Sequence, residues 1–141
     1  GLGAAIGAYV ATKDPVVLIT GDGSFGMNLN ELATAVTYDV PVVIVLMNNG
    51  VLGMVRQWQT LFFGKRYSST ILRRKTNFVK LAESFGADGY LAETAVEFRK
   101  AFKSAVEKGK TAVIEVRIDK DELVLPMLPP GGAITDMITK I

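Results

Sequence analysis

The clearest chemistry in this sequence comes from the pairing of one aspartate, Asp22, with one asparagine, Asn49. Asp22 lies between two glycines, and Asn49 directly follows another asparagine. An apolar, strand-like run precedes each of them, at 16–19 and 42–46. In a parallel sheet these runs would bring a carboxylate and an amide oxygen to one edge, beyond the carboxyl ends of the strands. Such oxygen donors are the ligands that Mg²⁺ prefers.

The glycines beside Asp22 favour a ligand that carries phosphate. Gly21 and Gly23 would allow a turn that brings backbone N–H groups close to an anion, and the start of the following helix would add its dipole. Magnesium takes few ligands from protein and the rest from phosphate and water. The alternative is a tight strand-to-helix turn and a separate Asn-Asn-Gly turn with no ligand. The pairing at this spacing favours a magnesium diphosphate site.

Composition limits the classes of function. The chain has 141 residues, is 49% hydrophobic and 21% charged, and so predicts one globular domain or a piece of one. A net charge of +2 does not indicate nucleic-acid binding, and we interpret the basic run 73–75 as a solvated loop. The chain has no cysteine, which excludes disulfides and thiolate sites. It also has no histidine, so an enzyme built on it needs an acid–base group from elsewhere.

The start of the chain suggests a fragment of a longer protein. No initiator methionine is present, and the first eleven residues resemble a packed helix rather than a signal peptide. No apolar run reaches the roughly 18 residues that a membrane span needs. We therefore expect residues 1–141 to be one domain of a longer subunit, with no membrane and no nucleic acid among its partners.

Strand-like and helical patterns alternate along the sequence, which predicts a three-layer α/β/α fold with a mostly parallel sheet. Strands are predicted at 16–20, 42–47, 90–92 and 112–116. Helices are predicted at the start, at about 28–37, from beyond residue 50 through Trp58 and Phe62, after Asn77, and after a Thr94–Glu97 capping box. Residues 64–76 are predicted to form a loop, and the tail from 126 is predicted to be mostly irregular.

Three segments resemble a known enzyme family. Residues 21–28 together with Asn48 and Asn49 resemble the thiamin diphosphate motif of decarboxylases and carboligases. Residues 48–59 and 125–132 are more specific, and both resemble the catalytic (large) subunit of acetolactate synthase, also called acetohydroxyacid synthase. The match runs over essentially the whole chain but covers only the C-terminal, diphosphate-binding part of that subunit.

The resemblance implies a role for individual residues at the cofactor. Asp22 and Asn49 would bind Mg²⁺ through their side chains, and Val51 would bind it through its backbone carbonyl. The residues in contact with the cofactor would be Gly21, Asp22, Gly23, Ser24, Asn49 and Met54. Met54 would lie near the thiazolium and pyrimidine rings, and Trp58 would line the substrate channel.

The resemblance also implies a reaction and partners. The full enzyme would condense two pyruvates, or pyruvate and 2-ketobutyrate, with decarboxylation through a thiamin diphosphate enamine, in branched-chain amino-acid biosynthesis. The glutamate that activates the cofactor and the FAD-binding domain would lie outside this chain. No catalytic residue is therefore expected within it, and the isolated chain is expected to be inactive. The implied assembly is a cytoplasmic homo-oligomer with active sites shared between subunits and a regulatory small subunit.

Several alternatives stay open at this point. The chain could come from another thiamin diphosphate enzyme, such as a glyoxylate carboligase or a benzoylformate-type decarboxylase, or from a non-catalytic domain that keeps only the fold. Taken without the resemblance, Met54 could fill a core, Trp58 could pack at a helix end, and Gln57 could lie on the surface.

Overall fold

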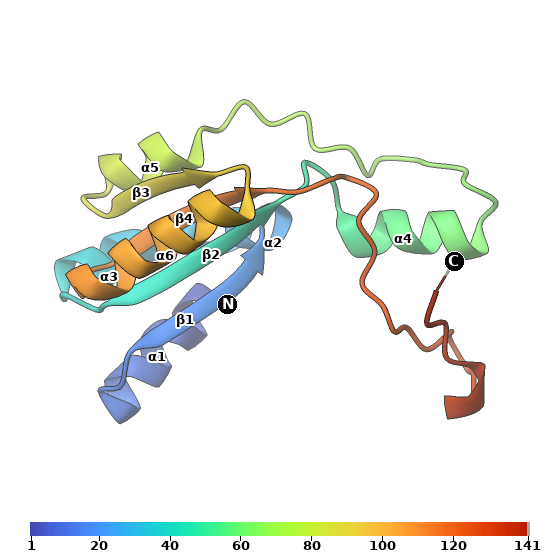
Figure 1. The fold of residues 1–141 in the computed structure, drawn as a ribbon, viewed down its shortest axis with the longest axis horizontal. Helices are drawn as coiled ribbons and strands as arrows, with labels where there is room; N and C mark the ends of the chain where they lie inside the picture. Colours follow the sequence, from blue (N-terminus) through green and yellow to red (C-terminus); the bar gives the residue numbers. More distant parts are fainter. Residues whose placement is uncertain (141) are drawn as a thin grey trace.

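A four-stranded parallel sheet forms the centre of the computed structural model, which describes residues 1–140. The strands are β1 (Val16–Gly21), β2 (Val42–Asn48), β3 (Asp88–Ala92) and β4 (Ala112–Arg117). Their order across the sheet is β1-β2-β4-β3, and every pairing is parallel (Figure 1). The predicted parallel sheet is confirmed. All four strands therefore point their carboxyl ends toward the same edge.

One face of the sheet packs against four helices: α1 (Leu2–Thr12), α2 (Asp22–Asn28), α3 (Leu32–Thr37) and α5 (Phe78–Ser84). The strand side chains in this core come from alternate positions, because successive residues of a strand point to opposite faces. The largest fully buried side chains of this core include Leu32, Ile44, Leu46 and Val113.

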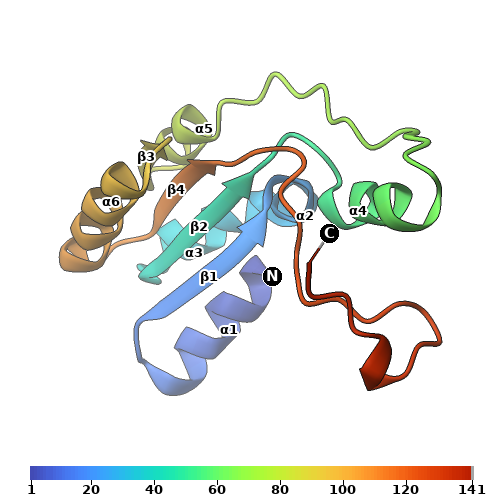
Figure 2. The same cartoon turned by 45° about the vertical axis from the view of Figure 1, so that its right-hand side comes forward.

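A single helix, α6 (Ala95–Lys108), covers the opposite face (Figure 2). Its buried alanines pack on β2, β3 and β4 in a second core cluster made of Val43, Ala92, Ala101, Ala105, Ala112 and Ile114. The predicted three layers are thus present over β3 and β4. Over β1 this face is open, because Val17 and Ile19 are 45% and 72% exposed.

The structure corrects the segment that follows β1. The predicted glycine turn is wrong: Gly21 ends the strand with φ −88° and ψ 160°, and α2 begins at Asp22 without a loop. The helix predicted at about 28–37 is wrong in its start and its continuity, since α2, a 3-10 turn (Leu29–Glu31) and α3 follow one another. Glycine has a low helix propensity, so Gly23 and Gly26 concealed α2, which Phe25 holds in the core.

The predicted helix ends of α5 and α6 are confirmed. The Asn77 side chain accepts a hydrogen bond from the Lys80 backbone N–H at 2.9 Å, which caps α5. The capping box of Thr94 and Glu97 begins α6. Gly86 follows α5 with φ +87°, a left-handed conformation that glycine adopts without a steric penalty.

Helix α4 (Gly53–Phe62) stands apart from the other helices, beyond the carboxyl ends of the strands (Figure 1). The C-terminal tail runs beside it and, as far as residue 140, contains one short 3-10 turn, Ile134–Asp136. Residues 64–76 contain no helix, as predicted. An isolated bridge between Val51 and Ile71 connects this loop to the segment that follows β2. Within residues 1–140, no helix combines the length and the apolar character required to cross a membrane.

Candidate functional site

The ends of β1 and β2 bring the predicted ligand residues into one cavity of about 590 Å³. Gly21 lies opposite Met47 in the parallel register, so the chain leaves both strands at the same level. The cavity is lined by every residue predicted to contact the cofactor or the metal: Gly21, Asp22, Gly23, Ser24, Asn49, Val51 and Met54. Residues more than twenty-five positions apart in sequence thus meet because two adjacent strands end together.

Asp22 is buried, with only 2% of its surface exposed. Within residues 1–140 it forms no salt bridge, although the Arg74 guanidinium donates to its backbone carbonyl at 2.5 Å. Burial raises the pKa of the Asp22 carboxyl, while the charge of Arg74 and the backbone amides of Asp22, Gly23 and Asn49 act in the opposite direction. A buried carboxylate without a paired cation fits a place for a bound metal ion.

Residues 48–51 form a tight turn that presents two further oxygens. The Asn49 Oδ1 accepts a hydrogen bond from the Val51 backbone N–H at 3.1 Å. The carbonyl of Gly50 and the N–H of Leu52 bond to residues 72 and 70, respectively. Among residues 1–140, no N–H donates to the carbonyl of Val51 between them. The Val51 side chain is buried, so its backbone is the part of this residue that can bind a ligand.

This donor set suits magnesium only in the presence of phosphate. Residues 1–140 contain no cluster of three or more His, Cys, Asp or Glu side chains that could hold a metal. One carboxylate, one amide oxygen and one free carbonyl match the few protein ligands that Mg²⁺ uses when phosphate oxygens and water supply the others. The cavity therefore fits a metal bound together with a phosphorylated cofactor better than a metal alone.

The first turn of α2 forms the part of the cavity next to Asp22. The N–H groups of Gly23 and Ser24 belong to this turn, and such groups have no acceptor within the helix. A Cβ atom on Gly23 would lie 3.1 Å from the Leu52 side chain, so glycine permits this close packing. Residues 73–75 lie in an exposed loop, as predicted. The guanidinium of Arg74 nevertheless reaches the site, where it contacts Gly26 and the Asp22 carbonyl.

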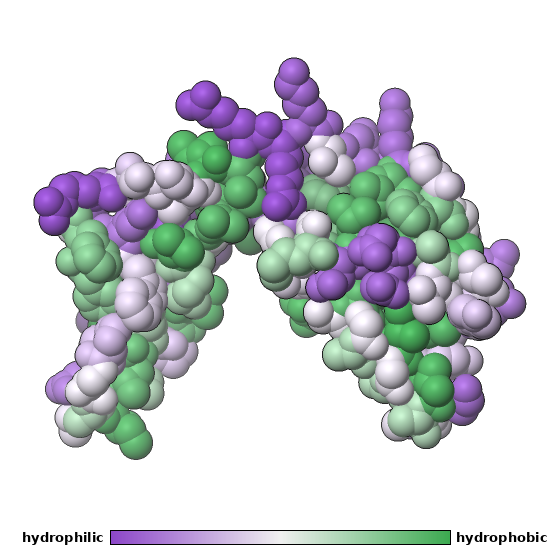
Figure 3. All heavy atoms as spheres, turned by 180° about the vertical axis from the view of Figure 1, so that it is seen from behind, coloured by the Kyte–Doolittle hydropathy of each residue, from purple (hydrophilic) through white to green (hydrophobic). Residues whose placement is uncertain are grey.

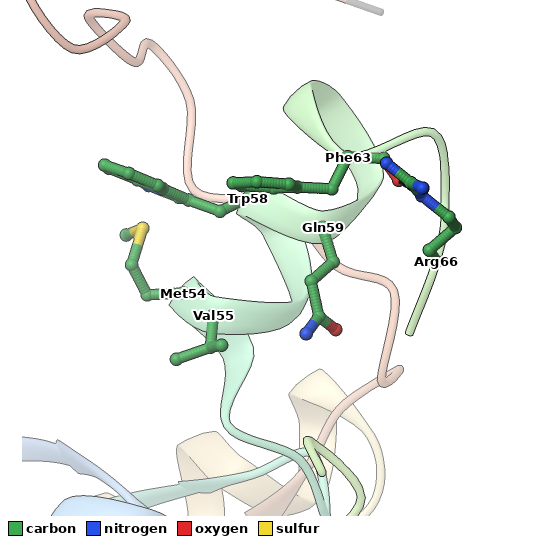
Figure 4. Close-up of a pocket in the computed structure, with 6 residues that line it drawn as sticks. All are labelled: Met54, Val55, Trp58, Gln59, Phe63 and Arg66. Atoms are coloured by element: carbon green, nitrogen blue, oxygen red, sulfur yellow. Dashed lines mark hydrogen bonds between the residues drawn. The ribbon is translucent and has the colours of Figure 1, made fainter. Parts of the chain in front are cut away.

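Helix α4 forms an apolar wall next to the cavity. A second pocket of about 530 Å³ is lined by Met54, Val55, Trp58, Gln59, Phe63 and Arg66 (Figure 4). In this view Met54 and Trp58 lie together at one end of it, Arg66 lies at the other, and the Phe63 ring points toward Trp58 between them. Met54 and Val55 also line the first cavity, so the two pockets adjoin each other. Seen from behind, an open notch separates two lobes, and apolar atoms lie along both of its sides (Figure 3).

Met54 and Trp58 do not act as core residues. Met54 is 50% exposed and Trp58 is 37% exposed. The Trp58 ring meets the Phe62 ring edge to face, with 5.7 Å between the ring centres. Both side chains therefore present apolar surface to the pocket.

Sequence reasoning missed the segment that follows β4, residues 118–124, as part of the cavity. Ile118, Glu122, Leu123 and Val124 line it. Gln57, considered a possible surface residue, is only 2% exposed. It donates from Nε2 to the Val124 carbonyl at 3.0 Å and accepts from the Val124 N–H at 2.8 Å. The neighbouring Arg56 pairs with Asp121 at 2.6 Å. The available signal in the sequence was that these two adjacent polar residues stand between apolar residues of one helix. That pattern does not indicate which residues they contact.

Comparison with known proteins agrees with this geometry. Residues 1–116 match the family described as "Thiamine pyrophosphate enzyme, C-terminal TPP binding domain". The chain is 44% identical over its full length to a probable acetolactate synthase large subunit of Methanocaldococcus jannaschii, covering 24% of that protein. It is 43% identical over its full length to the acetolactate synthase isozyme 2 large subunit of Escherichia coli, covering 26% of that protein.

Solved structures give the same fold. A thiamine diphosphate-dependent 4-hydroxybenzoylformate decarboxylase of Rhodococcus jostii RHA1 superposes with a TM-score of 0.78 at 37% identity, over 84% of this chain and 23% of that one. A benzoylformate decarboxylase of Polynucleobacter necessarius gives 0.75 at 30% identity, over 87% and 23%. The chain thus spans about a quarter of the length of the curated relatives it matches. With its parallel sheet, its cavity at the strand ends and this match, the chain belongs to the thiamine pyrophosphate enzymes, in which it corresponds to the C-terminal, cofactor-binding domain.

Proposed function

We propose that this chain is the cofactor-binding domain of an acetolactate synthase large subunit. The observation that carries the proposal is the identity of 39–44% with acetolactate synthases of archaea, bacteria and algae, which extends over 98–100% of the chain. The complete protein would condense two pyruvates, or pyruvate and 2-ketobutyrate, with loss of carbon dioxide. This reaction begins branched-chain amino-acid biosynthesis, and we place it in the cytoplasm.

Within the cavity, Asp22, Asn49 and the Val51 carbonyl would bind Mg²⁺. The N–H groups of Gly23 and Ser24 would bind the diphosphate to which the metal is attached, and Gly21 would let the strand end approach it. The buried position of Asp22 and the free Val51 carbonyl support these roles. When bound, thiamin diphosphate supplies the carbanion chemistry, and the protein supplies position and electrostatics.

The α4 wall would control what reaches the cofactor. Met54 would lie beside the reactive rings and exclude water from them. Trp58 would line the channel and, through the size of its ring, select between acceptor 2-keto acids. The apolar lining shared by the two pockets supports this arrangement.

Other parts of the active site would come from outside this chain. Residues 1–140 contain no histidine, and Glu122 is the only acidic side chain besides Asp22 that lines the cavity. From the similarity to acetolactate synthases we infer that the glutamate that activates the cofactor comes from another domain, on a partner subunit of a homo-oligomer. An FAD-binding domain and a regulatory small subunit complete the proposed enzyme.

A benzoylformate-type decarboxylase is the second candidate, because the solved structures described above carry that activity in their names. A glyoxylate carboligase, or a domain that keeps only the fold, are weaker candidates. These functions differ in the substrate that each consumes and in whether the cofactor binds at all.

The test compares substrates in the full-length protein that contains this chain. Acetolactate should form from pyruvate in the presence of Mg²⁺ and thiamin diphosphate, and benzaldehyde should not form from benzoylformate. Trp58→Leu should change the preference between pyruvate and 2-ketobutyrate as acceptor and leave cofactor affinity unchanged, because Trp58 lies outside the metal-binding cavity. Benzaldehyde production without acetolactate would contradict the proposal. Isolated residues 1–141 should form no acetolactate.

A further inference from the structure

Glu115 is a buried charged side chain to which the proposed reaction gives no role. It lies in β4 and is 2% exposed. It pairs in register with Leu46 of β2, and alternation along β4 places it on the same face as Val113, within the core under α1, α2, α3 and α5. Burial of a carboxylate costs free energy unless hydrogen bonds and a charge partner compensate for it.

Two groups bind one oxygen of this carboxylate. The Asn48 Nδ2 donates to Glu115 Oε1 at 2.7 Å, and the Arg117 Nε forms an ion pair with the same oxygen at 2.8 Å. Arg117 is half exposed and carries its charge toward solvent. The hydrogen bond from Asn48 therefore joins β4 to the last residue of β2.

This hydrogen bond fixes the orientation of the Asn48 amide. Because Nδ2 faces Glu115, Oδ1 faces the other way and accepts from the Gly50 N–H at 3.1 Å. The Asn48 backbone carbonyl accepts from the Ile118 N–H at 3.1 Å. Gly50 adopts a left-handed φ of +68°, and the Asn49 amide then accepts from Val51. A chain of hydrogen bonds thus leads from Glu115 through Asn48 into the turn that carries Asn49 and Val51.

We propose that Glu115 is a positioning residue for the cation: it binds no metal, but it orients Asn48 and thereby holds the Asn49 oxygen and the Val51 carbonyl in place. The inference rests on the proposed function, since the oxygens it concerns are those of the proposed magnesium site. Groups that orient metal ligands without touching the metal alter metal affinity by about 10- to 100-fold when they are removed.

The experiment measures Mg²⁺ binding in the full-length protein at saturating thiamin diphosphate, by titration calorimetry. Glu115→Leu should raise the Mg²⁺ dissociation constant about 10-fold or more, because Asn48 Nδ2 loses its acceptor and the amide is free to turn. Glu115→Gln keeps a carbonyl oxygen for Asn48. Its Mg²⁺ dissociation constant should stay within about 3-fold of the wild-type value, well below the effect expected for Glu115→Leu.

A matched control separates positioning from general stability. Glu97→Ala removes a glutamate that makes structural hydrogen bonds away from the site, in the capping box of α6. It should lower the melting temperature without Mg²⁺ and leave the Mg²⁺ dissociation constant unchanged. Should Glu115→Leu not fold, Asn48→Ala removes the other end of the same hydrogen bond and should show the same loss of affinity.

The outcomes distinguish this inference from the proposed function. A wild-type protein that binds Mg²⁺ with thiamin diphosphate, together with a Glu115→Leu or Asn48→Ala variant of unchanged affinity, overturns the positioning role and leaves the proposed function intact. An equal loss of affinity in Glu97→Ala overturns it too. A wild-type protein that does not bind Mg²⁺ with thiamin diphosphate overturns both the positioning role and the proposed function.

Discussion

Asp22 combines two properties that oppose each other in the unliganded protein. Its carboxyl is buried, which raises its pKa, and yet its position suits a charged metal ligand. Burial makes the unpaired carboxylate energetically unfavourable. A bound metal ion pairs with this charge and removes the free-energy cost of burying it. The unliganded fold should therefore be under electrostatic stress at this residue.

Asp22→Asn tests this stress. A pKa that is raised in the folded state means that the neutral carboxyl stabilises the fold at low pH and that this contribution is lost as pH rises through the folded pKa. The neutral amide should therefore unfold at an equal or higher urea concentration than wild type at pH 8, without metal. Binding of Mg²⁺ with thiamin diphosphate should weaken by at least ~10-fold in calorimetry. An Asn variant clearly less stable than wild type at pH 8 would contradict this explanation.

At the scale of elements, the packing of β3 on α5 depends on a glycine. A Cβ atom on Gly89 would lie 2.7 Å from the Val79 backbone carbonyl oxygen and 2.9 Å from its Cγ1. A backbone atom cannot move aside as a side-chain end can, so the strand and helix would have to separate. Gly7, by contrast, lies in α1 with open space around it.

Gly89→Ala should therefore cost about 1–3 kcal/mol of unfolding free energy through overpacking. Gly7→Ala is the matched control and should be neutral or stabilising by up to about 1 kcal/mol, since alanine favours a helix. Urea unfolding of both variants checks the pair. An equal effect of the two substitutions would show that close packing at Gly89 is unimportant.

An ion pair connects β3 to α6. The Lys108 Nζ lies 2.8 Å from Asp88 Oδ2, and this contact lowers the pKa of Asp88 below its ordinary 3.8 and raises that of Lys108 above its ordinary 10.5. A lowered carboxyl pKa stabilises the fold above the ordinary value, and the stabilisation is lost as pH falls through the folded pKa. The raised lysine pKa stabilises it below 10.5 and is lost at more alkaline pH.

Asp88→Asn should lower stability between about pH 5 and 10, a window that lies between the two ordinary pKa values of 3.8 and 10.5. The difference from wild type should shrink below pH 3.8, as the wild-type carboxyl becomes protonated. Urea unfolding across this range measures it, with Glu107→Gln on the exposed side of α6 as the control. A difference independent of pH would point to packing rather than to charge.

At the scale of the whole molecule, the coverage of the sheet is uneven. The strand order leaves one edge of β1 free, and Val17 and Ile19 of this strand are exposed on the face that α6 does not reach. Helix α1 beside it is apolar around most of its circumference and exposes Val10 at 56%. Exposed strand edges and apolar faces promote association.

The 141-residue chain should therefore associate as its concentration rises. Ile19→Thr should weaken the association by removing apolar surface beside the free edge. Val96→Thr, at an exposed site on α6, should not. Light scattering measures this association over a 100-fold range of protein concentration. That range corresponds to roughly 2.7 kcal/mol in the chemical potential of the protein. A monomer at every concentration would contradict it.

Much of this architecture could be predicted because it depends on local patterns. Continuous apolar runs predicted the buried strands, and the capping residues Asn77, Thr94 and Glu97 predicted where two helices begin. The start of α2 could not be predicted, since its glycines have low helix propensity and its helix is held by Phe25 in the core. For the same reason the sequence indicated a turn where the structure has none.

By itself, the sequence determined the types of donor at the site and the alternation that makes the sheet parallel. Asp22, Asn49 and the glycines were identifiable because their chemistry belongs to their own side chains and neighbours. Only the tertiary structure decided which distant groups support them: Glu115 beneath Asn48, Arg74 beside Asp22, and Gln57 against Val124. These contacts join residues more than fifty positions apart. No local pattern specifies them, because strand order and packing set which groups meet.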